Sequence, residues 1–277
     1  MGSRMAQRLL TAGYPLTVYN RNAARCAPFT AAGAQAAPTP RAAAGRAEVI
    51  LSMLADDNAS RGLWLGEQGA LAGAAPGTIL IECSTVSVGW IAELNAAATA
   101  RGCPLLDAPV LGTKPHAAAG ELTFLVGGPA PALETVRPVL AAMSRAVVHF
   151  GPTGSGALVK LVNNFLCGVQ IASLAEAIGI IERSGLDRTQ VLELLNGAAP
   201  GSPLLKTISG RMAARDYTPN FALRLMAKDL AYARQEGSLR GVNVETAAAA
   251  IAVFQKAISA GRGDEDMSAV VEQFRPS

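Results

Sequence analysis

Residues that bind metals or form disulfides are scarce in this chain of 277 residues. No Cys-x-x-Cys pair occurs; the four cysteines and two histidines are scattered, at Cys26, Cys83, Cys103, Cys167, His116 and His149. This spacing supports neither a disulfide framework nor a zinc site. We therefore expect reduced thiols, a cytoplasmic location and no bound metal.

Long uncharged apolar runs and a strong excess of one charge are also missing. No stretch of about 18 apolar residues without a charge occurs, so the sequence predicts no membrane-spanning segment. The longest apolar stretch, residues 161–175, is interrupted by polar residues and predicts a buried helix. A net charge of only +3 does not indicate a nucleic-acid binder.

Acidic residues are absent from the first 47 positions, which contain six arginines. Such a composition is typical of an organelle transit peptide. It is equally expected of a region that binds phosphate. The motifs described below favour the phosphate-binding interpretation.

Short apolar segments alternate with alanine-rich amphipathic segments between residues 14 and 150. The expected strands are 16–19, 49–54, 79–82, 104–107, 122–126 and 146–150, and helices such as 86–100 and 131–143 lie between them. This alternation predicts an α/β fold with a doubly wound, mainly parallel sheet. After Gly154 the pattern predicts helices only. We therefore expect one domain at residues 1–152 and an all-α domain at residues 153–277.

The start of the chain resembles the second half of a dinucleotide-binding unit. Residues 2–13 predict a helix that ends at Gly13, and strand 16–19 and Asn20-Arg21 follow it. In a complete unit a strand and Gly-x-Gly-x-x-Gly precede this helix, and of the three glycines only Gly2 is present. We expect the central first strand to be missing, with unpaired edges beside its place, and the natural protein to carry about ten more residues. The intact mass of the native protein tests this expectation.

Lys160 lies in an apolar helix that follows a glycine-rich turn at residues 151–156. Apolar surroundings favour the neutral form of a lysine, which suits it to donate and accept a proton. Asn164 follows one helical turn later on the same face. The alternative is a lysine whose ammonium reaches the surface along the helix.

Five segments, in order, resemble motifs of the β-hydroxyacid dehydrogenases, a family that includes 3-hydroxyisobutyrate dehydrogenase and glyoxylate/succinic semialdehyde reductase. They are residues 1–6, 107–128, 154–164, 225–230 and 263–269. Gly-Thr-Lys-Pro at 112–115, together with Asn20-Arg21, is most similar to the glyoxylate/succinic semialdehyde reductases. The resemblance implies a Rossmann-like dinucleotide-binding domain, a helical substrate and dimerisation domain, and an NAD(P)-dependent oxidoreductase acting on CH–OH groups. It also implies a small-molecule substrate and a homodimer or homotetramer.

The resemblance assigns the acid/base role to Lys160. It implies substrate contacts from Thr85, Leu111, Gly112, Thr113, Asn164, Phe221 and Asp229, and cofactor contacts from Gly2, Asn20, Arg21, Met53, Leu54, Ser84, Thr85 and Lys228. Alternatives remain for several of them. Lys228 and Asp229 can form a solvated surface pair, Ser84 and Thr85 can cap the next helix, and Phe221 can belong to the core. His116 and His149 are expected at the surface or at strand ends.

Leu111 departs from the family pattern, which usually has serine there to hold the substrate carboxylate. Leucine cannot donate a hydrogen bond, so backbone N–H groups around Gly112 and Thr113, or other side chains, must hold this group. Losing one donor to a buried carboxylate costs about 1–3 kcal/mol. We therefore expect weak activity on the usual small acids, or a different substrate.

Arg21 and the absence of a nearby acid favour NADP(H) over NAD(H), although NAD remains possible. An acidic residue at this strand end binds the ribose hydroxyls of NAD, whereas a guanidinium suits a 2′-phosphate. The expected function is NADP(H)-dependent reduction of a small aldehyde acid of the glyoxylate or succinic semialdehyde type. The alternatives are an NAD-dependent 3-hydroxyacid dehydrogenase of the 3-hydroxyisobutyrate type and a non-catalytic truncated relative.

Overall fold

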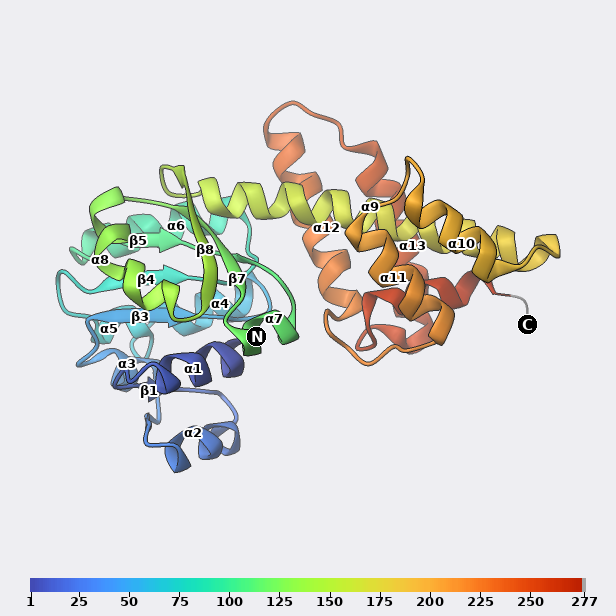
Figure 1. Ribbon diagram of the computed structural model, residues 1–277. Helices are drawn as coiled ribbons and strands as arrows, with labels where there is room; N and C mark the ends of the chain where they lie inside the picture. The colour runs from blue at the N-terminus through green and yellow to red at the C-terminus, as the bar shows by residue number, and fades with distance from the viewer. Residues whose placement is uncertain (276–277) are drawn as a thin grey trace. The chain divides into compact units, whose positions relative to one another are not determined.

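The computed structural model describes residues 1–275 and divides into two compact units, Met1–Lys160 and Leu161–Ser277 (Figure 1). The boundary that the sequence predicts near residue 152 falls where the last strand ends and helix α9 (Ser155–Ser184) begins. Because α9 starts in the first unit and continues into the second, the two units share one continuous helix.

The first unit alternates strands and helices. Its strands are β1 (Thr17–Val18), β2 (Gln35–Ala36), β3 (Val49–Ser52), β4 (Ile79–Glu82), β5 (Leu105–Asp107), β6 (Val110–Leu111), β7 (Leu122–Gly127) and β8 (Ser144–Gly151). Its helices are α1 (Gly2–Thr11), η1 (Ala23–Cys26), α2 (Ala27–Ala31), α3 (Pro40–Ala44), α4 (Asp57–Trp64), α5 (Ala70–Gly73), α6 (Val88–Ala100), α7 (Lys114–Ala119) and α8 (Ala130–Ala141). The predicted α/β class is confirmed, and two short strands, β2 and β6, were not predicted.

The larger sheet has the strand order β3-β4-β5-β7-β6, and β8 also pairs with β7. Strands β3, β4 and β5 are parallel, and Ser52, Glu82 and Asp107 lie in register across them. Strand β7 runs antiparallel to β5 and β6. Strand β8 pairs parallel to β7. The sheet is therefore mixed, but parallel pairs outnumber antiparallel ones, as the predicted mainly parallel sheet requires. The antiparallel strands were not foreseen, because hydrophobic alternation predicts a strand but not its direction.

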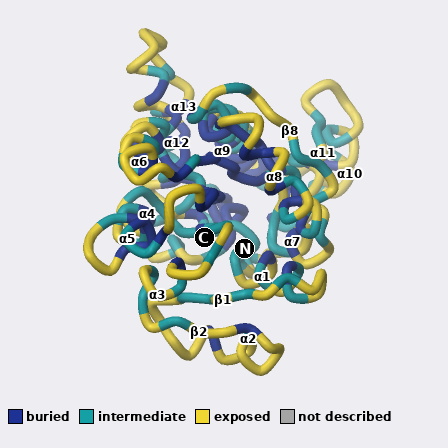
Figure 2. The backbone as a smooth tube through the Cα atoms, turned by 90° about the vertical axis from the view of Figure 1, so that its left-hand side faces the viewer, coloured by how far each residue is buried: buried dark blue, intermediate teal, exposed yellow. Residues whose placement is uncertain are grey.

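Strands β1 and β2 form a separate parallel pair. Within residues 1–275, β1 pairs only with β2 and β3 pairs only with β4. The unpaired edges that the sequence predicts are therefore observed. The β2 and α2 segments contain no buried residue, and Figure 2 shows them mostly exposed.

Both faces of the larger sheet are buried. Along β4, Ile79 and Ile81 belong to one hydrophobic cluster and Leu80 belongs to another. Successive side chains of a strand point to opposite faces, so this alternation means that each face has its own core. Helix α6 contributes Trp90 and Leu94 to the cluster that contains Leu80.

Among the described residues after Lys160, every regular element of the second unit is a helix, and one isolated antiparallel bridge joins Ala222 to Asp266. Helix α9 is followed by α10 (Arg188–Gly197), α11 (Pro203–Ala214), α12 (Leu223–Leu239), α13 (Glu245–Ala257), η2 (Ile258–Arg262) and η3 (Met267–Phe274). Helix α9 is long and apolar enough to cross a membrane, but half of that segment is buried within the protein. Its Ile171 and Ile178 pack in one core with Leu230 and Phe254, as expected of a buried helix.

Candidate functional site

The carboxyl ends of β3 and β4 bring four predicted site residues to one edge of the sheet. Met53 and Leu54 follow β3, and Ser84 and Thr85 follow β4. The two turns are joined, because the Leu54 N–H donates to the Ser84 hydroxyl at 2.7 Å. Open α/β sheets bind their ligands at this edge.

A fully buried carboxylate fixes the turn after β4. Glu82 Oε2 accepts hydrogen bonds from the Ser60 hydroxyl at 2.5 Å and from the Trp64 indole at 2.9 Å. Its Oε1 accepts from the Ser84 N–H at 2.8 Å. Trp90 in turn donates to Ser60 at 2.8 Å. These donors satisfy a carboxylate that water does not reach, so the backbone at Ser84 is firmly held.

Ser84 does not cap the following helix, which the sequence offered as an alternative role. The side chain of Ser87 accepts from the Trp90 N–H at 3.1 Å and caps α6 instead. Ser84 is only 1% exposed. Its hydroxyl therefore joins the loops after β3 and β4, whereas Thr85 is partly exposed beside it.

Asp107, at the end of β5, holds the start of the helix that carries Lys160. Its Oδ1 accepts from the Gly154 N–H and its Oδ2 accepts from the Ala157 N–H, both at 2.7 Å. The carboxyl group is fully buried, and burial raises its pKa to about 6 although these hydrogen bonds lower it. The first turn of α9 thus has an anionic cap from a distant strand.

Two glycines allow α9 to approach the sheet closely. A Cβ atom at Gly156 would overlap the Leu125 carbonyl oxygen and lie 2.8 Å from that of Asp107. A Cβ atom at Gly127 would lie 2.6 Å from the Asp107 carboxylate. Larger residues at either position would push the helix from the strands.

Lys160 lies in the second turn of α9 and is partly buried. It follows the Asp107-bound Ala157 by three residues, so the capped first turn sets its position directly. Asn164 follows four residues later on the same helix, which places both side chains on one helical face.

The loop expected to hold the substrate carboxylate offers fewer donors than predicted. The Thr113 N–H already donates to His116 Nδ1 at 3.2 Å, so it is not available as expected. Gly112 is exposed and has φ +118°, a conformation that favours glycine. Leu111 is partly buried. His116 is a local cap of α7, while His149 Nε2 lies 2.9 Å from the Gly128 carbonyl oxygen.

The start of α1 lies beside the end of β3. A Cβ atom at Gly2 would be 3.4 Å from that of Met53. The first turn of α1 contains no acidic residue, and no side chain caps it. The free N–H groups and the helix dipole make this end suited to an anionic group.

Asn20 and Arg21 follow β1 in an exposed turn. Asn20 Oδ1 accepts from the Asn22 N–H at 3.0 Å, and Asn22 Oδ1 accepts from the Ala24 N–H at 3.2 Å. These bonds order the turn. Arg21 is exposed, and the nearest acid in the sequence is Glu48.

In the second unit, Asp229 joins the predicted residues of α9 and α12. The Asn164 amide donates to Asp229 Oδ2 at 2.6 Å, and Lys228 Nζ lies 2.9 Å from Asp229 Oδ1. The Lys228 ammonium also lies 4.8 Å from the centre of the Tyr232 ring. The side chains of Lys228 and Asp229 are only 16% and 1% exposed, so the alternative of a solvated surface pair is wrong.

Phe221 and Asn163 belong to this unit as well. Phe221 is partly buried and packs against the hydrophobic core, which agrees with its alternative role in packing. The Asn163 amide donates to Asn164 Oδ1 at 3.0 Å, so Asn163 orients its neighbour.

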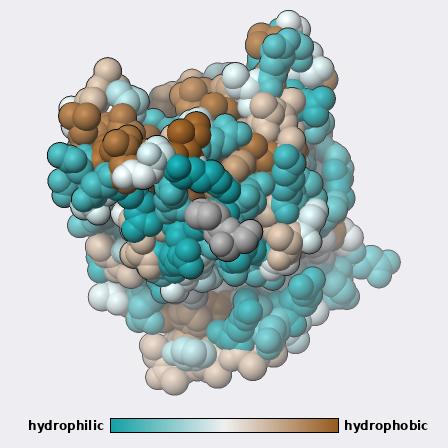
Figure 3. Space-filling view, turned by 90° about the vertical axis from the view of Figure 1, so that its right-hand side faces the viewer, coloured by the Kyte–Doolittle hydropathy of each residue, from teal (hydrophilic) through white to brown (hydrophobic). Residues whose placement is uncertain are grey.

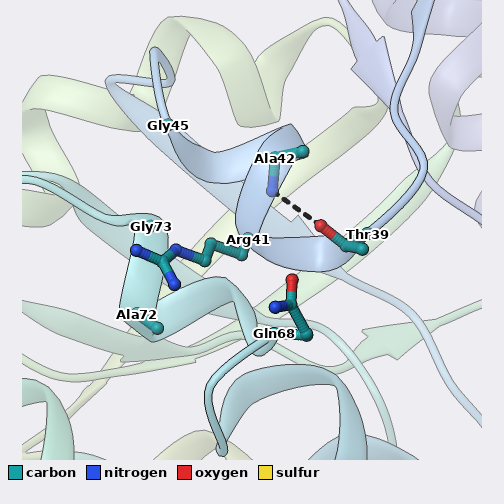
Figure 4. A pocket seen from close by; sticks show the side chains of 7 residues that line it. All are labelled: Thr39, Arg41, Ala42, Gly45, Gln68, Ala72 and Gly73. Atoms are coloured by element: carbon teal, nitrogen blue, oxygen red, sulfur yellow. Dashed lines mark hydrogen bonds between the residues drawn. The ribbon is translucent and has the colours of Figure 1, made fainter.

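The structure also contains a hollow of about 490 Å³ between α3 and α5 (Figure 4). It is lined by Thr39, Arg41, Ala42, Gly45, Gln68, Ala72 and Gly73. None of the predicted site residues lines it. Among residues 1–275, no group of three or more His, Cys, Asp or Glu side chains is arranged to hold a metal ion.

Sequence reasoning assigned no role to Glu82 and Asp107. Both are acidic residues that end otherwise apolar strands, at Ile79–Glu82 and Leu105–Asp107. A carboxylate at the end of a buried strand needs several donors, so this pattern was a usable signal. The donors themselves, at residues 60, 64, 154 and 157, are revealed only by the fold.

Two family models cover nearly the whole chain. Residues 1–151 match the NAD binding domain of 6-phosphogluconate dehydrogenase. Residues 154–274 match the model described as NAD-binding of NADP-dependent 3-hydroxyisobutyrate dehydrogenase.

Individual proteins match over their full length or most of it. The chain is 37% identical to the NAD-dependent L-serine dehydrogenase of Pseudomonas aeruginosa, over 100% of this chain and 95% of that protein. It is 33% identical to the chloroplastic glyoxylate/succinic semialdehyde reductase 2 of Arabidopsis thaliana, over 99% of this chain and 77% of that protein. The solved structure of Mycobacterium tuberculosis 3-hydroxyisobutyrate dehydrogenase with L-serine matches with a TM-score of 0.89 and 30% identity, over 100% of this chain and 96% of that one.

The sheet edge of the first unit fits a dinucleotide. The α1 N-terminus has no side-chain cap, and Gly2 adds no side chain where a phosphate would approach. Met53 and Ser84 lie at the adjoining strand ends, where the fold places such a ligand.

Proposed function

Because the chain belongs to the β-hydroxyacid dehydrogenase family and is an NAD(P)-dependent oxidoreductase, we propose that it reduces a small aldehyde acid with NADPH. The aldehyde acid is of the glyoxylate or succinic semialdehyde type, and the product is the hydroxyacid. The main observation in support is a partly buried lysine, Lys160, on a helix whose first turn is anchored by Asp107.

In the proposed reaction, the nicotinamide cofactor supplies a hydride to the carbonyl carbon when it is bound. The Lys160 ammonium donates a proton to the carbonyl oxygen, which becomes the hydroxyl group of the product. The lysine is left neutral and regains a proton from water. In the oxidative direction the neutral lysine takes the hydroxyl proton, so one side chain serves both directions.

The substrate carboxylate and the remaining polar groups need several donors. We assign these contacts to the Gly112 backbone, the Thr85 hydroxyl and the Asn164 amide. Leu111 supplies an apolar wall in place of a donor. Asp229 holds the Asn164 amide in one orientation, so we assign it an indirect role in substrate binding.

For the cofactor, we propose that the α1 N-terminus at Gly2 binds the pyrophosphate. The turns at Met53–Leu54 and Ser84–Thr85 would line the path of the nucleotide. The family resemblance also assigns a cofactor contact to Lys228. Arg21 and Asn20 would bind the 2′-phosphate of NADP, because the turn that carries them has an exposed guanidinium and no carboxylate.

A second candidate is NAD-dependent oxidation of a 3-hydroxyacid such as L-serine. The Pseudomonas aeruginosa relative is named for this reaction and is 37% identical over the whole chain. A panel of small aldehyde acids and 3-hydroxyacids, assayed with NADP(H) and with NAD(H), separates the two candidates. Higher kcat/KM with NADPH and glyoxylate or succinic semialdehyde supports the first. Higher kcat/KM with NAD and a 3-hydroxyacid supports the second.

The role of Lys160 is tested by Lys160→Ala, with Lys256→Ala as the matched control. Lys256 is an exposed lysine on α13. Removing a general acid/base lowers kcat by about 100- to 10,000-fold. Cofactor binding by fluorescence titration is expected to be retained. Undiminished turnover in Lys160→Ala would refute the mechanism, and a wild-type chain that binds no nucleotide would indicate a non-catalytic relative.

The cofactor assignment is tested by Arg21→Ala, with Arg25→Ala as the control. Arg25 is exposed on the neighbouring η1 helix. Losing a charge-assisted bond of about 1.5–3 kcal/mol weakens NADP binding by roughly 10- to 150-fold. The Kd for NAD should change little in either variant. Equal effects on both cofactors in Arg21→Ala would contradict the assignment.

A further inference from the structure

We propose that Asp107 is a positioning residue for catalysis, which sets the location of Lys160 by holding the first turn of α9 against the sheet. This inference depends on the proposed function only through the role of Lys160. Asp107 is assigned no contact with the substrate or the cofactor.

The geometry of the carboxylate supports this role. A helix leaves its first N–H groups without partners, and here both oxygens of Asp107 accept from that turn. The two acceptors reach Gly154 and Ala157 at 2.7 Å each, which fixes both the axial position and the rotation of the helix start. Lys160 follows Ala157 by one helical turn, so a rotation of that turn displaces its ammonium.

The anchor itself cannot move easily. Asp107 ends β5, a strand paired with β4 on one side and with β7 on the other. Gly127 on β7 faces the carboxylate at a distance that allows no side chain. Gly156 lets the helix backbone rest on the carbonyl oxygens of Leu125 and Asp107. The start of α9 is therefore held in place by β5 and by the two strands that pair with it, β4 and β7.

Both oxygens accept from N–H groups only while the carboxyl group is ionised. Protonation turns one oxygen into a donor that faces an N–H group, so one of the two bonds is lost. Burial raises the pKa of Asp107 to about 6, which brings this change close to neutral pH.

Other titratable groups lie on the elements that pack against β5. Glu82 is in register on β4 and is held by its own three donors. The acids of α6 and α8, Glu93 and Glu134, form exposed pairs with Arg61 and Arg137. Strand β7 carries no titratable side chain, and Lys160 itself is on α9.

The test compares Asp107→Asn with Asp266→Asn in the full chain. Asp266 is the matched control, because it is also a buried aspartate and accepts from the backbone N–H groups of Asn220, Phe221 and Ser268 in the second unit. An asparagine keeps one acceptor but places an NH₂ group against the second backbone N–H. We expect Asp107→Asn to lower kcat by about 10- to 100-fold, since a misplaced catalytic group is costly. The KM for the cofactor should stay within about two-fold.

Two readouts separate positioning from simple destabilisation. Amide hydrogen exchange of residues 154–162 should be about ten-fold faster or more in Asp107→Asn, with residues 188–197 of α10 unchanged. The kcat of the wild type should decrease as the pH is lowered below about 6, and this decrease should be absent from Asp107→Asn. Asp266→Asn should keep both the wild-type exchange at 154–162 and the wild-type decrease of kcat at low pH.

The outcomes are distinguishable from a failure of the proposed function. Suppose that the wild type is active and that Lys160→Ala loses activity. If Asp107→Asn then keeps the wild-type kcat and hydrogen exchange, the positioning role of Asp107 is overturned and the proposed function is not. Equal changes in Asp107→Asn and Asp266→Asn would also overturn it. If Asp107→Asn does not fold, the test is made on the wild type: exchange at 154–162, corrected for its intrinsic pH dependence, must change between pH 7 and pH 5. Unchanged corrected exchange would refute the proposal.

Discussion

Three buried carboxylates hold the segments on which the predicted site residues stand. Glu82 binds the backbone of Ser84, and Asp107 binds the first turn of α9. Asp229 binds the side chains of Asn164 and Lys228. A buried carboxylate is stable only when hydrogen-bond donors surround it. Each of these three carboxylates therefore holds its donor groups in place, and the donors hold the carboxylate in place.

Asp229 is expected to contribute strongly to the stability of the second unit. In Asp229→Ala, the largely buried Lys228 ammonium loses the carboxylate 2.9 Å away, and the buried Asn164 amide loses an acceptor. Breaking such a pair costs about 3–5 kcal/mol. Asp229→Asn keeps an acceptor for Asn164 and should cost less. Urea denaturation measures both values.

The control for this prediction is the exposed pair of Arg224 and Asp264, whose side chains are 51% and 88% exposed. Asp264→Ala should change the free energy of unfolding by less than about 1 kcal/mol. If Asp229→Ala lowers the free energy of unfolding as little as Asp264→Ala does, Asp229 is not a buried anchor.

Asp107 should give the folded protein a characteristic pH dependence. Its pKa is about 6 in the fold and about 3.9 in an unfolded chain, so the folded state binds the proton more tightly. The resulting stabilisation is fully present below about pH 4 and is lost as the pH rises through 6. Two pKa units correspond to roughly 2–3 kcal/mol.

This contribution is measured as the difference in unfolding free energy between the wild type and Asp107→Asn. The difference should shift in favour of the wild type as the pH falls from 7 to 4.5. A difference that is flat over this range would show that Asp107 has an ordinary pKa in the folded state.

At the scale of secondary-structure elements, α9 depends on glycine to reach the sheet. In Gly156→Ala the new methyl group would overlap the Leu125 carbonyl oxygen, which is backbone and cannot rotate away. We expect a loss of about 1–3 kcal/mol in stability and a lower kcat, because α9 shifts with Lys160.

Gly62→Ala is the matched control, since Gly62 is an exposed helical glycine of α4 with open space around its Cβ position. That variant should gain about 0.5–1 kcal/mol in stability, because alanine favours the helix. If Gly156→Ala behaves like Gly62→Ala in denaturation and turnover, α9 does not rest on the sheet as described.

At the scale of the whole molecule, the second unit exposes apolar side chains that a monomer leaves in water. Ile180, Leu194 and Leu239 are each more than 70% exposed. Figure 3 shows hydrophobic patches among the hydrophilic residues of one face. Such patches often mark interfaces, and we propose that a second copy of the chain covers them in a homodimer or homotetramer.

The oligomer is tested by light scattering coupled to gel filtration. The mass should be a multiple of 28.4 kDa at micromolar concentration. Ile180→Glu should shift the mass toward the monomer, because an interface does not accept an unpaired buried charge. Lys206→Glu, at an exposed lysine of α11, controls for the change in net charge. A wild-type mass of one chain would refute this proposal.

Much of the architecture follows from the sequence alone. Apolar periodicity locates the strands from Ile79 and Leu122 and the change to a helical region, because burial of side chains repeats every two residues in strands and every three or four in helices. It also locates the helix that ends at Ala100, although the predicted start at residue 86 is two residues too early. The glycine-rich turn before Lys160 and the order of the motifs also identify the family. The short strands β2 and β6 carry no such signal, since two residues do not establish a period. The direction of β7 is not encoded either, because periodicity is the same in parallel and antiparallel strands.

Only the tertiary structure decides which polar groups meet. Asp107 reaches Gly154 across 47 residues, and Asn164 reaches Asp229 across 65. The Thr113 N–H, expected to bind substrate, is occupied by His116. Hydrogen bonds between distant residues depend on how strands and helices pack, and local sequence patterns contain no record of that packing.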